Sequence, residues 1–82
     1  MIELVIYTRR GCCLCQDMKD VVEEASRGFP VRLSLVDVDS RPELARQYGE
    51  ELPVLFVDGT KFAKYRTDAR RLRRKLQAAQ RA

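Results

Sequence analysis

The chain has 82 residues, which is enough for one domain over residues 1–82 with one modest hydrophobic core. Hydrophobic residues make up 45% of it, too large a share for a disordered chain, and no apolar run approaches the roughly 20 residues of a membrane span. The formal net charge is +4, and much of the positive charge lies near the C-terminus, where it could attract nucleic acid or acidic partners.

The first part of the chain predicts a strand followed by a helix. Residues 3–7 form a short apolar run that is typical of a buried strand. From Cys12 the hydrophobic residues follow helical spacing, and Gly28 is placed to end that helix. The predicted apolar stripe consists of Leu14, Met18, Val21, Val22 and Ala25.

The middle of the chain predicts a second strand and a short helix. Residues 31–37 alternate, which indicates a half-buried strand with its apolar side chains on one face. Residues 40–43, Ser-Arg-Pro-Glu, match a capping box with a proline in the first helical turn. Gly49 should end this helix. The inward residues of the strand are Val31, Leu33 and Leu35, and those of the helix are Leu44 and Tyr48.

The last part of the chain predicts a hairpin and a third helix. Residues 53–57 form the next strand, and Asp58-Gly59 is a strong signal for a two-residue turn, so residues 60–65 should return antiparallel. Thr67 or Asp68 can cap the last helix. Its predicted buried stripe is Ala69, Leu72, Leu76 and Ala79.

Together these elements predict an α/β fold with the order β-α-β-α-β-β-α. The first β-α-β unit should form a parallel pair with a right-handed crossover. The hairpin adds an antiparallel pair, so we expect a mixed four-stranded sheet flanked by helices on both faces.

All three cysteines lie between Tyr7 and Cys15, and the chain has no histidine. The N-terminus begins directly as a strand without a basic leader, so we expect no secretory signal and a cytoplasmic location. Structural disulfides are rare in that compartment, where a Cys-x-x-Cys pair is usually catalytic or metal-binding.

Cys12 is the predicted nucleophile. We expect it in the first turn of a helix, where unpaired backbone N–H groups and the helix dipole favour the thiolate over the thiol. Arg9 and Arg10 lie close in the sequence and add positive charge. Because the thiolate is the reactive form of cysteine, these features predict an activated Cys12.

The spacing selects Cys15 as the partner of Cys12. Cys15 falls on the same helical face as Cys12, whereas Cys13 points about 100° around the helix. A bridge between adjacent cysteines also fits disulfide geometry poorly. We therefore predict that Cys12 attacks a substrate disulfide and that Cys15, the more buried thiol, resolves the mixed disulfide. Cys13 is expected to be a buried or half-buried thiol without a role.

Other function classes remain open for the same residues. A structural zinc site needs about four ligands, usually Cys or His, so this chain would have to add a carboxylate or an outside ligand. An iron–sulfur cluster carrier, with the cluster shared between two chains or completed by small thiols, is a second alternative. A third is a non-catalytic module that binds nucleic acid through the basic C-terminal helix, although such a charge run without interleaved aromatics is more typical of a solvated helix face.

Four segments carry a family resemblance: LVIYT at 4–8, RRG at 9–11, CCLC at 12–15 and ELPVLFVDG at 51–59. Together they resemble a glutaredoxin-like protein of the thioredoxin fold, and Cys-x-Leu-Cys is similar to the active site of small bacterial members. The resemblance runs from Glu3 to about Leu76. It implies an enzyme, a thiol-disulfide oxidoreductase that carries electrons in cell redox homeostasis and reduces protein or glutathione mixed disulfides.

The resemblance also implies roles for individual residues. Cys12 matches the attacking cysteine and Cys15 the resolving one. Arg9 stands where glutaredoxins often carry a basic residue that meets a glutathione carboxylate. Pro53 matches the family's cis-proline, which would bring the backbone of Leu52 beside the disulfide, where it could pair with an extended substrate. From the residues alone, a trans proline at the start of a strand is the alternative.

Residues 62–68 depart from the family pattern. Glutaredoxins commonly carry Gly-Gly before the last helix, followed by a polar pair that grips glutathione, but here no glycine follows Gly59. Thr67 and Asp68 take the place of the polar pair, at a helix N-terminus that suits an anion. Plain helix capping is the alternative role for both residues. The same segment partly resembles redoxins that serve ribonucleotide reductase and take electrons from thioredoxin reductase.

The expected partners are protein disulfide substrates and a reductant, which is either glutathione or a thioredoxin reductase. We expect no tightly bound cofactor and no metal, although glutathione is a candidate electron donor. We also expect a monomer without membrane contact and without nucleic acid as a partner.

Overall fold

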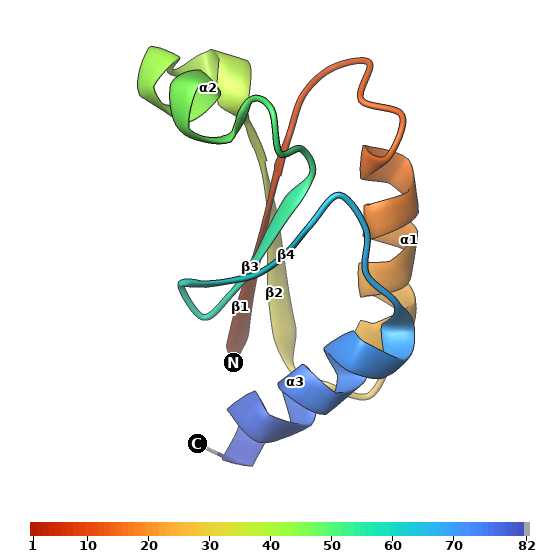
Figure 1. Cartoon of the computed structure of the whole chain (residues 1–82). Helices are drawn as coiled ribbons and strands as arrows, with labels where there is room; N and C mark the ends of the chain where they lie inside the picture. The colour runs from red at the N-terminus through yellow and green to blue at the C-terminus, as the bar shows by residue number, and fades with distance from the viewer. Residues whose placement is uncertain (82) are drawn as a thin grey trace.

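The computed structural model describes residues 1–81 and shows a sheet flanked by helices (Figure 1). Its elements are β1 (Ile2–Thr8), α1 (Cys15–Ser26), β2 (Val31–Asp37), the short 3₁₀ helix η1 (Val38–Ser40), α2 (Pro42–Tyr48), β3 (Val54–Val57), β4 (Thr60–Lys64) and α3 (Ala69–Arg81). The predicted order of strands and helices is confirmed, with η1 added before α2. Within the described part of the chain, no helix is long and apolar enough to cross a bilayer.

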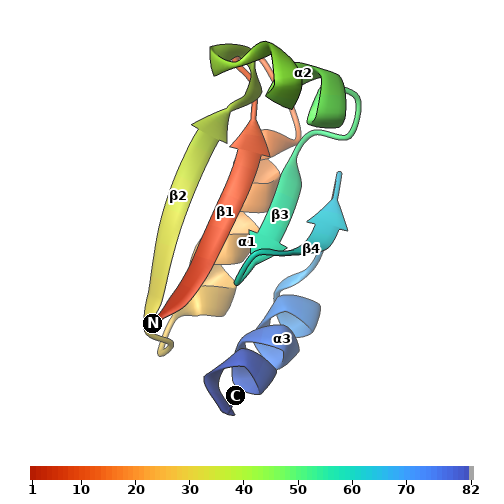
Figure 2. The same ribbon diagram turned by 90° about the vertical axis from the view of Figure 1, so that its left-hand side faces the viewer.

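The four strands form one mixed sheet in the order β2-β1-β3-β4. β1 and β2 are parallel, with Ile2 opposite Val31 and Thr8 opposite Asp37. β3 pairs antiparallel with both β1 and β4. The predicted mixed sheet is therefore confirmed, and Figure 2 shows β2 and β4 as its two edge strands.

The hydrophobic core lies between the sheet and the helix pair α1 and α3 (Figures 1 and 2). Alternate residues of β1 are buried because successive strand side chains point to opposite faces. Burying a side chain the size of leucine contributes about 1.5–3 kcal/mol, so this cluster fixes both helices on the sheet. Its buried members are Ile2, Leu4, Ile6, Met18, Val22, Ala25, Leu55, Val57, Leu72 and Leu76.

The other face of the sheet is covered by α2, at the end where β1 finishes (Figure 1). Tyr48 of α2 stacks on Tyr7 of β1, with ring centroids 4.5 Å apart. Phe56 of β3 meets both rings edge-on, at 5.4 Å from Tyr7 and 5.7 Å from Tyr48. Aromatic pairs favour such geometry, so this trio holds α2 on the sheet and places helices on both faces, as predicted.

The hairpin forms where the sequence predicts it. Asp58 and Gly59 both have positive φ, 48° and 81°, which is the conformation of a two-residue hairpin turn. The backbone N–H of Asp58 donates to the carbonyl of Glu3 at 2.8 Å, and the carboxylate of Asp58 accepts from the N–H of Glu3 at 2.9 Å. The turn is therefore fastened to the start of β1.

Two local predictions in the middle of the chain are wrong. Leu35 is 51% exposed, although Val31 and Leu33 on the same face pack against the core. The alternating pattern predicts on which face of the sheet a side chain lies, but not whether another element packs over it. β2 is an edge strand, with a neighbouring strand on one side only. The expected capping box also fails, because the Ser40 hydroxyl donates to the carbonyl of Asp37 at 2.6 Å within η1 and leaves α2 without a side-chain cap.

Candidate active site

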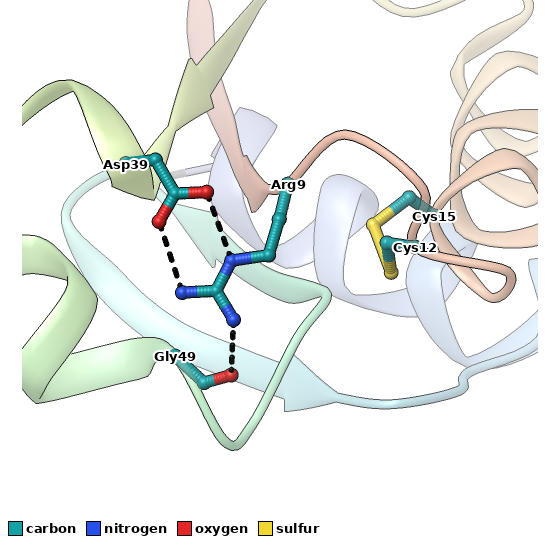
Figure 3. Close-up of a disulfide and its surroundings, with 5 residues drawn as sticks. All are labelled: Arg9, Cys12, Cys15, Asp39 and Gly49. Carbon is teal, nitrogen blue, oxygen red and sulfur yellow. Dashed lines mark hydrogen bonds and ion pairs between the residues drawn. A yellow bond between two sulfur atoms is a disulfide. The ribbon is translucent and has the colours of Figure 1, made fainter.

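Cys12 and Cys15 are joined in a disulfide between the end of β1 and the start of α1 (Figure 3). Their Cα atoms lie 5.5 Å apart, a usual separation for bridged cysteines. The pair is the one that the spacing predicts, and both residues are half-buried. The greater burial of Cys15 stays a prediction. Cys13 is exposed, contrary to expectation, because it lies in the turn before the helix rather than on a helical face.

The turn that carries Cys12 differs from the predicted first helical turn. α1 begins at Cys15, so Cys12 precedes the helix. The backbone N–H of Cys12 donates to the carbonyl of Arg9 at 3.1 Å, and its carbonyl accepts from the N–H of Cys15 at 3.4 Å. Gly11 has a φ of 82°, a conformation that glycine adopts without steric cost and that lets the chain reverse here.

Of the electrostatic argument for Cys12, the part that rests on the helix keeps a structural basis, whereas Arg9 is paired with Asp39; activation of Cys12 stays a prediction. Its sulfur is bonded to Cys15, the first residue of α1, so it lies at the amino end of that helix. No side chain caps this end. Free first-turn N–H groups and the positive end of the helix dipole favour a thiolate at such a position.

The guanidinium of Arg9 forms an ion pair with Asp39 within the protein. It points toward Asp39 and Gly49 and not toward the disulfide (Figure 3). Its Nε lies 3.0 Å from Oδ2 of Asp39, and another of its nitrogens donates to the carbonyl of Gly49 at 3.5 Å. Arg9 thereby ties the end of β1 to η1 and to the end of α2. Its contact with a glutathione carboxylate stays a prediction.

The peptide bond between Leu52 and Pro53 is cis, as the family resemblance implies. Pro53 is fully buried and Leu52 half-buried. The carbonyl of Pro53 accepts a hydrogen bond from the backbone N–H of Tyr65 at 2.9 Å. The binding of a substrate by the Leu52 backbone stays a prediction.

Glu51, directly before this bond, is held by the neighbouring hairpin strand. Its carboxylate forms an ion pair with the Lys61 ammonium of β4. The hydrogen bond from Lys61 lowers the pKa of Glu51; desolvation opposes this, and the charges of Lys61 and Lys64 add to the lowering. The segment before Pro53 is thus fastened to β4.

Tyr65 is a site residue that the sequence alone does not single out. Besides its backbone bond to Pro53, its hydroxyl donates to the carbonyl of Glu50 at 3.0 Å. It adopts a φ of 66°, which is rare for an aromatic residue, and its side chain is 44% exposed. An irregularity in the β3–β4 register between Leu55 and Phe56 brings Tyr65 to Pro53, and the turn signal does not reveal such a bulge.

Thr67 and Asp68 have different surroundings. Asp68 caps α3, because its carboxylate accepts from the backbone N–H of Arg71 at 2.8 Å, so the capping alternative holds for this residue. Thr67 lines a cavity of about 200 Å³ between the first half of α1 and the segment that precedes α3. That cavity is also lined by Asp17, Met18, Val21, Tyr65 and Arg66. Only Thr67 therefore faces a space that a ligand could enter.

Within residues 1–81, no three Cys, His, Asp or Glu side chains are grouped so that they could hold a metal ion.

A family model and a curated relative with similar sequences are both described as glutaredoxin-like. The family model "Glutaredoxin-like domain (DUF836)" matches residues 3–77. A Dictyostelium discoideum protein named glutaredoxin-like protein YDR286C homolog is 31% identical over 77 residues, which cover 87% of this chain and 71% of that protein. A protein of Mycobacterium tuberculosis described as uncharacterized is 29% identical over 76 residues, which cover 87% of this chain and 78% of the relative.

Solved structures share the fold. The X-ray structure of the structural-genomics target XcR50 from X. campestris has a TM-score of 0.74 and 31% identity, and the match covers 92% of this chain and 96% of that one. The solution structure of reduced desulfothioredoxin from Desulfovibrio vulgaris Hildenborough has a TM-score of 0.69 and 29% identity, with 95% of this chain and 80% of that one covered. The sheet and helices described above are thus the thioredoxin-like arrangement.

Proposed function

The chain belongs to the family of glutaredoxin-like domains, and from this premise we propose that it is a thiol-disulfide oxidoreductase that reduces protein or glutathione mixed disulfides. The observation that carries the proposal is the Cys12–Cys15 disulfide, which closes within one chain at the amino end of α1. Both cysteines are half-buried and lie outside the buried core cluster, which supports exchange with thiols from outside.

The first step of the proposed cycle is an attack by the reduced protein. The Cys12 thiolate attacks one sulfur of the substrate disulfide, a bond forms between the two sulfurs, and the substrate S–S bond breaks. The other substrate sulfur leaves as a thiolate and takes up a proton. The amino end of α1 favours the anionic form of Cys12, which raises the fraction that can react.

The second step closes the ring between the two cysteines. Cys15 gives up its proton and attacks the Cys12 sulfur of the mixed disulfide, and the remaining half of the substrate leaves as a thiol. The protein has then passed two electrons to the substrate, and of the two protons taken up one comes from Cys15 and the other from solvent. The disulfide of the structure represents this oxidised state, which a dithiol or two molecules of a monothiol such as glutathione would reduce.

The substrate is proposed to lie along the segment that ends at Pro53. An extended chain could pair with the backbone of Leu52 in the manner of an added strand. Tyr65 supports this segment through its bonds to Glu50 and Pro53. Thr67 offers a polar group in the adjoining cavity.

Two of the residues expected to hold glutathione already have internal partners. Arg9 pairs with Asp39, and the carboxylate of Asp68 caps α3. Glutathione would have to displace these bonds, so we propose a protein reductase of the thioredoxin reductase kind as the preferred donor. A cytoplasmic location and a monomeric state are part of the proposal.

The test is a reduction assay on a disulfide substrate with three single variants. Cys12→Ser should abolish turnover, and Cys15→Ser should block reactions that need the second thiol. Cys13→Ser is the matched control, since it removes a neighbouring thiol outside the pair and should keep turnover near that of the unaltered protein. Full activity in Cys12→Ser would refute the mechanism.

A further inference from the structure

A basic groove is lined by residues of the edge strand β4, of the helix α3 and of the segment that joins them. Its volume is about 570 Å³. Five of its eight lining residues are cationic and none is acidic. These five, the groove cations, are Lys64, Arg66, Arg71, Arg74 and Lys75.

The protein itself neutralises little of this charge. The nearest ion pair joins Arg71 to Asp68 at 3.8 Å, and both side chains are largely exposed. Within residues 1–81, four of the groove cations form no salt bridge: Lys64, Arg66, Arg74 and Lys75. The groove therefore presents several unpaired charges of one sign to an incoming ligand.

The sequence of α3 makes this arrangement unfavourable for the isolated helix. Ala69–Arg81 contains six cations and no Asp or Glu. Arg70 and Arg74 are four positions apart, as are Arg71 and Lys75, and like charges at that spacing destabilise a helix. An anionic ligand in the groove would relieve the repulsion.

The groove continues toward the helix that carries the disulfide. Arg66 and Thr67 line both the groove and the cavity beside α1. Asp17, two residues after Cys15 in the sequence, also lines that cavity. A peptide that occupies this cavity would therefore reach the groove cations through Arg66 and Thr67.

We propose that this groove binds an acidic segment of the protein whose disulfide the chain reduces. The inference rests on the proposed function for the disulfide and adds a class of substrate, a protein with Asp or Glu residues near its reducible cystine. Arginine side chains bind carboxylates through paired hydrogen bonds, and a cleft of one charge speeds association with a partner of the other. Nucleic acid is disfavoured, because the one aromatic lining residue, Phe62, is half-buried and offers little surface for base stacking.

The test compares two disulfide-bonded peptides that are identical except for an extension of Asp and Glu in one and of Asn and Gln in the other. The groove variant is Arg66→Glu with Arg74→Glu. The control is Arg73→Glu with Arg81→Glu, which changes net charge equally on exposed residues outside the groove and puts no carboxylate three or four positions from a groove cation. We expect the groove variant to lose about tenfold or more in kcat/KM on the acidic peptide and the control to lose about twofold or less. Activity on the neutral peptide should be unchanged in both.

Equal losses in the two variants would overturn the inference, because net charge alone would then explain them. The groove substitutions Arg66→Gln and Arg74→Gln, which add no negative charge, should produce a smaller loss of the same selectivity if the groove is the binding site. Circular dichroism of each variant checks that it is folded.

A binding measurement separates this inference from the proposed function. Fluorescence anisotropy of the acidic peptide with serines in place of its cysteines needs no redox chemistry. Salt-dependent binding that the groove variant loses and the control keeps would support the inference even if the protein reduced neither peptide, a result that would defeat the proposed function alone. Tighter binding of a single-stranded oligonucleotide of equal charge would overturn the assignment to an acidic protein.

Discussion

Arg9 and Asp39 form a two-point ion pair, in which Nε and one terminal nitrogen of Arg9 each lie 3.0 Å from a carboxylate oxygen. The two residues are thirty positions apart in the chain. Their pairing fixes the end of β1, from which the disulfide turn begins, against η1 (Figure 3). Arg9 thus has a structural partner before any ligand arrives.

A double-mutant cycle measures this pair. Arg9→Met and Asp39→Asn should each lower the free energy of unfolding, and the coupling between them should be about 0.5 to 1 kcal/mol, the upper range for exposed pairs. Urea denaturation of both single variants and the double variant gives the value. The exposed neighbour Arg10, changed to Met, is the control and should shift stability by less than about 0.5 kcal/mol. A coupling near zero would show that the pair does not hold the turn.

The Glu51–Lys61 pair predicts a pH effect beside Pro53. The hydrogen bond from Lys61 lowers the pKa of Glu51. The pair therefore stabilises the fold at pH values above the ordinary carboxyl pKa, and this contribution is lost as the pH falls through the lowered pKa.

An NMR titration of the Glu51 carboxyl group tests this effect. Lys61→Met should raise the pKa of Glu51 toward its usual value, because the hydrogen bond and the nearest charge are both removed. Lys64→Met is the matched control, since Lys64 acts on Glu51 only through its charge, and it should raise the pKa less. An unchanged pKa in Lys61→Met would contradict the ion pair.

Tyr65 should support substrate binding through the segment before Pro53. Tyr65→Phe removes the hydroxyl that donates to the Glu50 carbonyl and should cost about 0.5–1.5 kcal/mol of stability, as for a typical hydrogen bond. On a peptide disulfide, its KM should rise more than its kcat falls, because the cysteines are untouched. Tyr48→Phe, which keeps the stacking on Tyr7, is the control. A fall in kcat with KM unchanged would argue against a supporting role.

The attachment of α3 depends on its buried stripe. Leu72 is 0% exposed within the core, so Leu72→Ala should destabilise the fold by about 2–5 kcal/mol through lost burial and a cavity. Arg73→Ala, at the adjacent exposed position, should change stability by less than about 0.5 kcal/mol. Thermal and urea unfolding of the two variants gives the comparison, and similar losses would show that α3 is not part of the cooperative core.

The sequence predicts the elements whose determinants are local. Asp58-Gly59 specifies its turn because both positions need positive φ, and the helical spacing of Leu72 and Leu76 marks the face that becomes buried. The Cys12–Cys15 pairing is also predicted correctly from the three-residue spacing, although Cys12 lies in the turn before the helix and not on its face. Each of these features depends on residues a few positions apart.

The features that the sequence did not predict depend on residues far apart in the chain or on hydrogen bonds between backbone groups. The role of Arg9 depends on Asp39, and that of Tyr65 on a bulge that brings it to Pro53. The start of α1 at Cys15 instead of Cys12 is set by backbone hydrogen bonds in the preceding turn, for which no side chain gives a signal. Local patterns could therefore place the two cysteines but could not show what surrounds them.

The most direct test of the central claim is to trap the mixed disulfide with Cys15→Ser protein and a disulfide-bonded peptide, and to identify the modified cysteine by peptide mass mapping. Without Cys15 the first exchange cannot be resolved, so half of the peptide should remain attached to the protein. We predict that it is found on Cys12, with Cys13 unmodified although Cys13 is the exposed thiol. Attachment chiefly to Cys13, or no attachment at all, would contradict the assignment of Cys12 as the nucleophile.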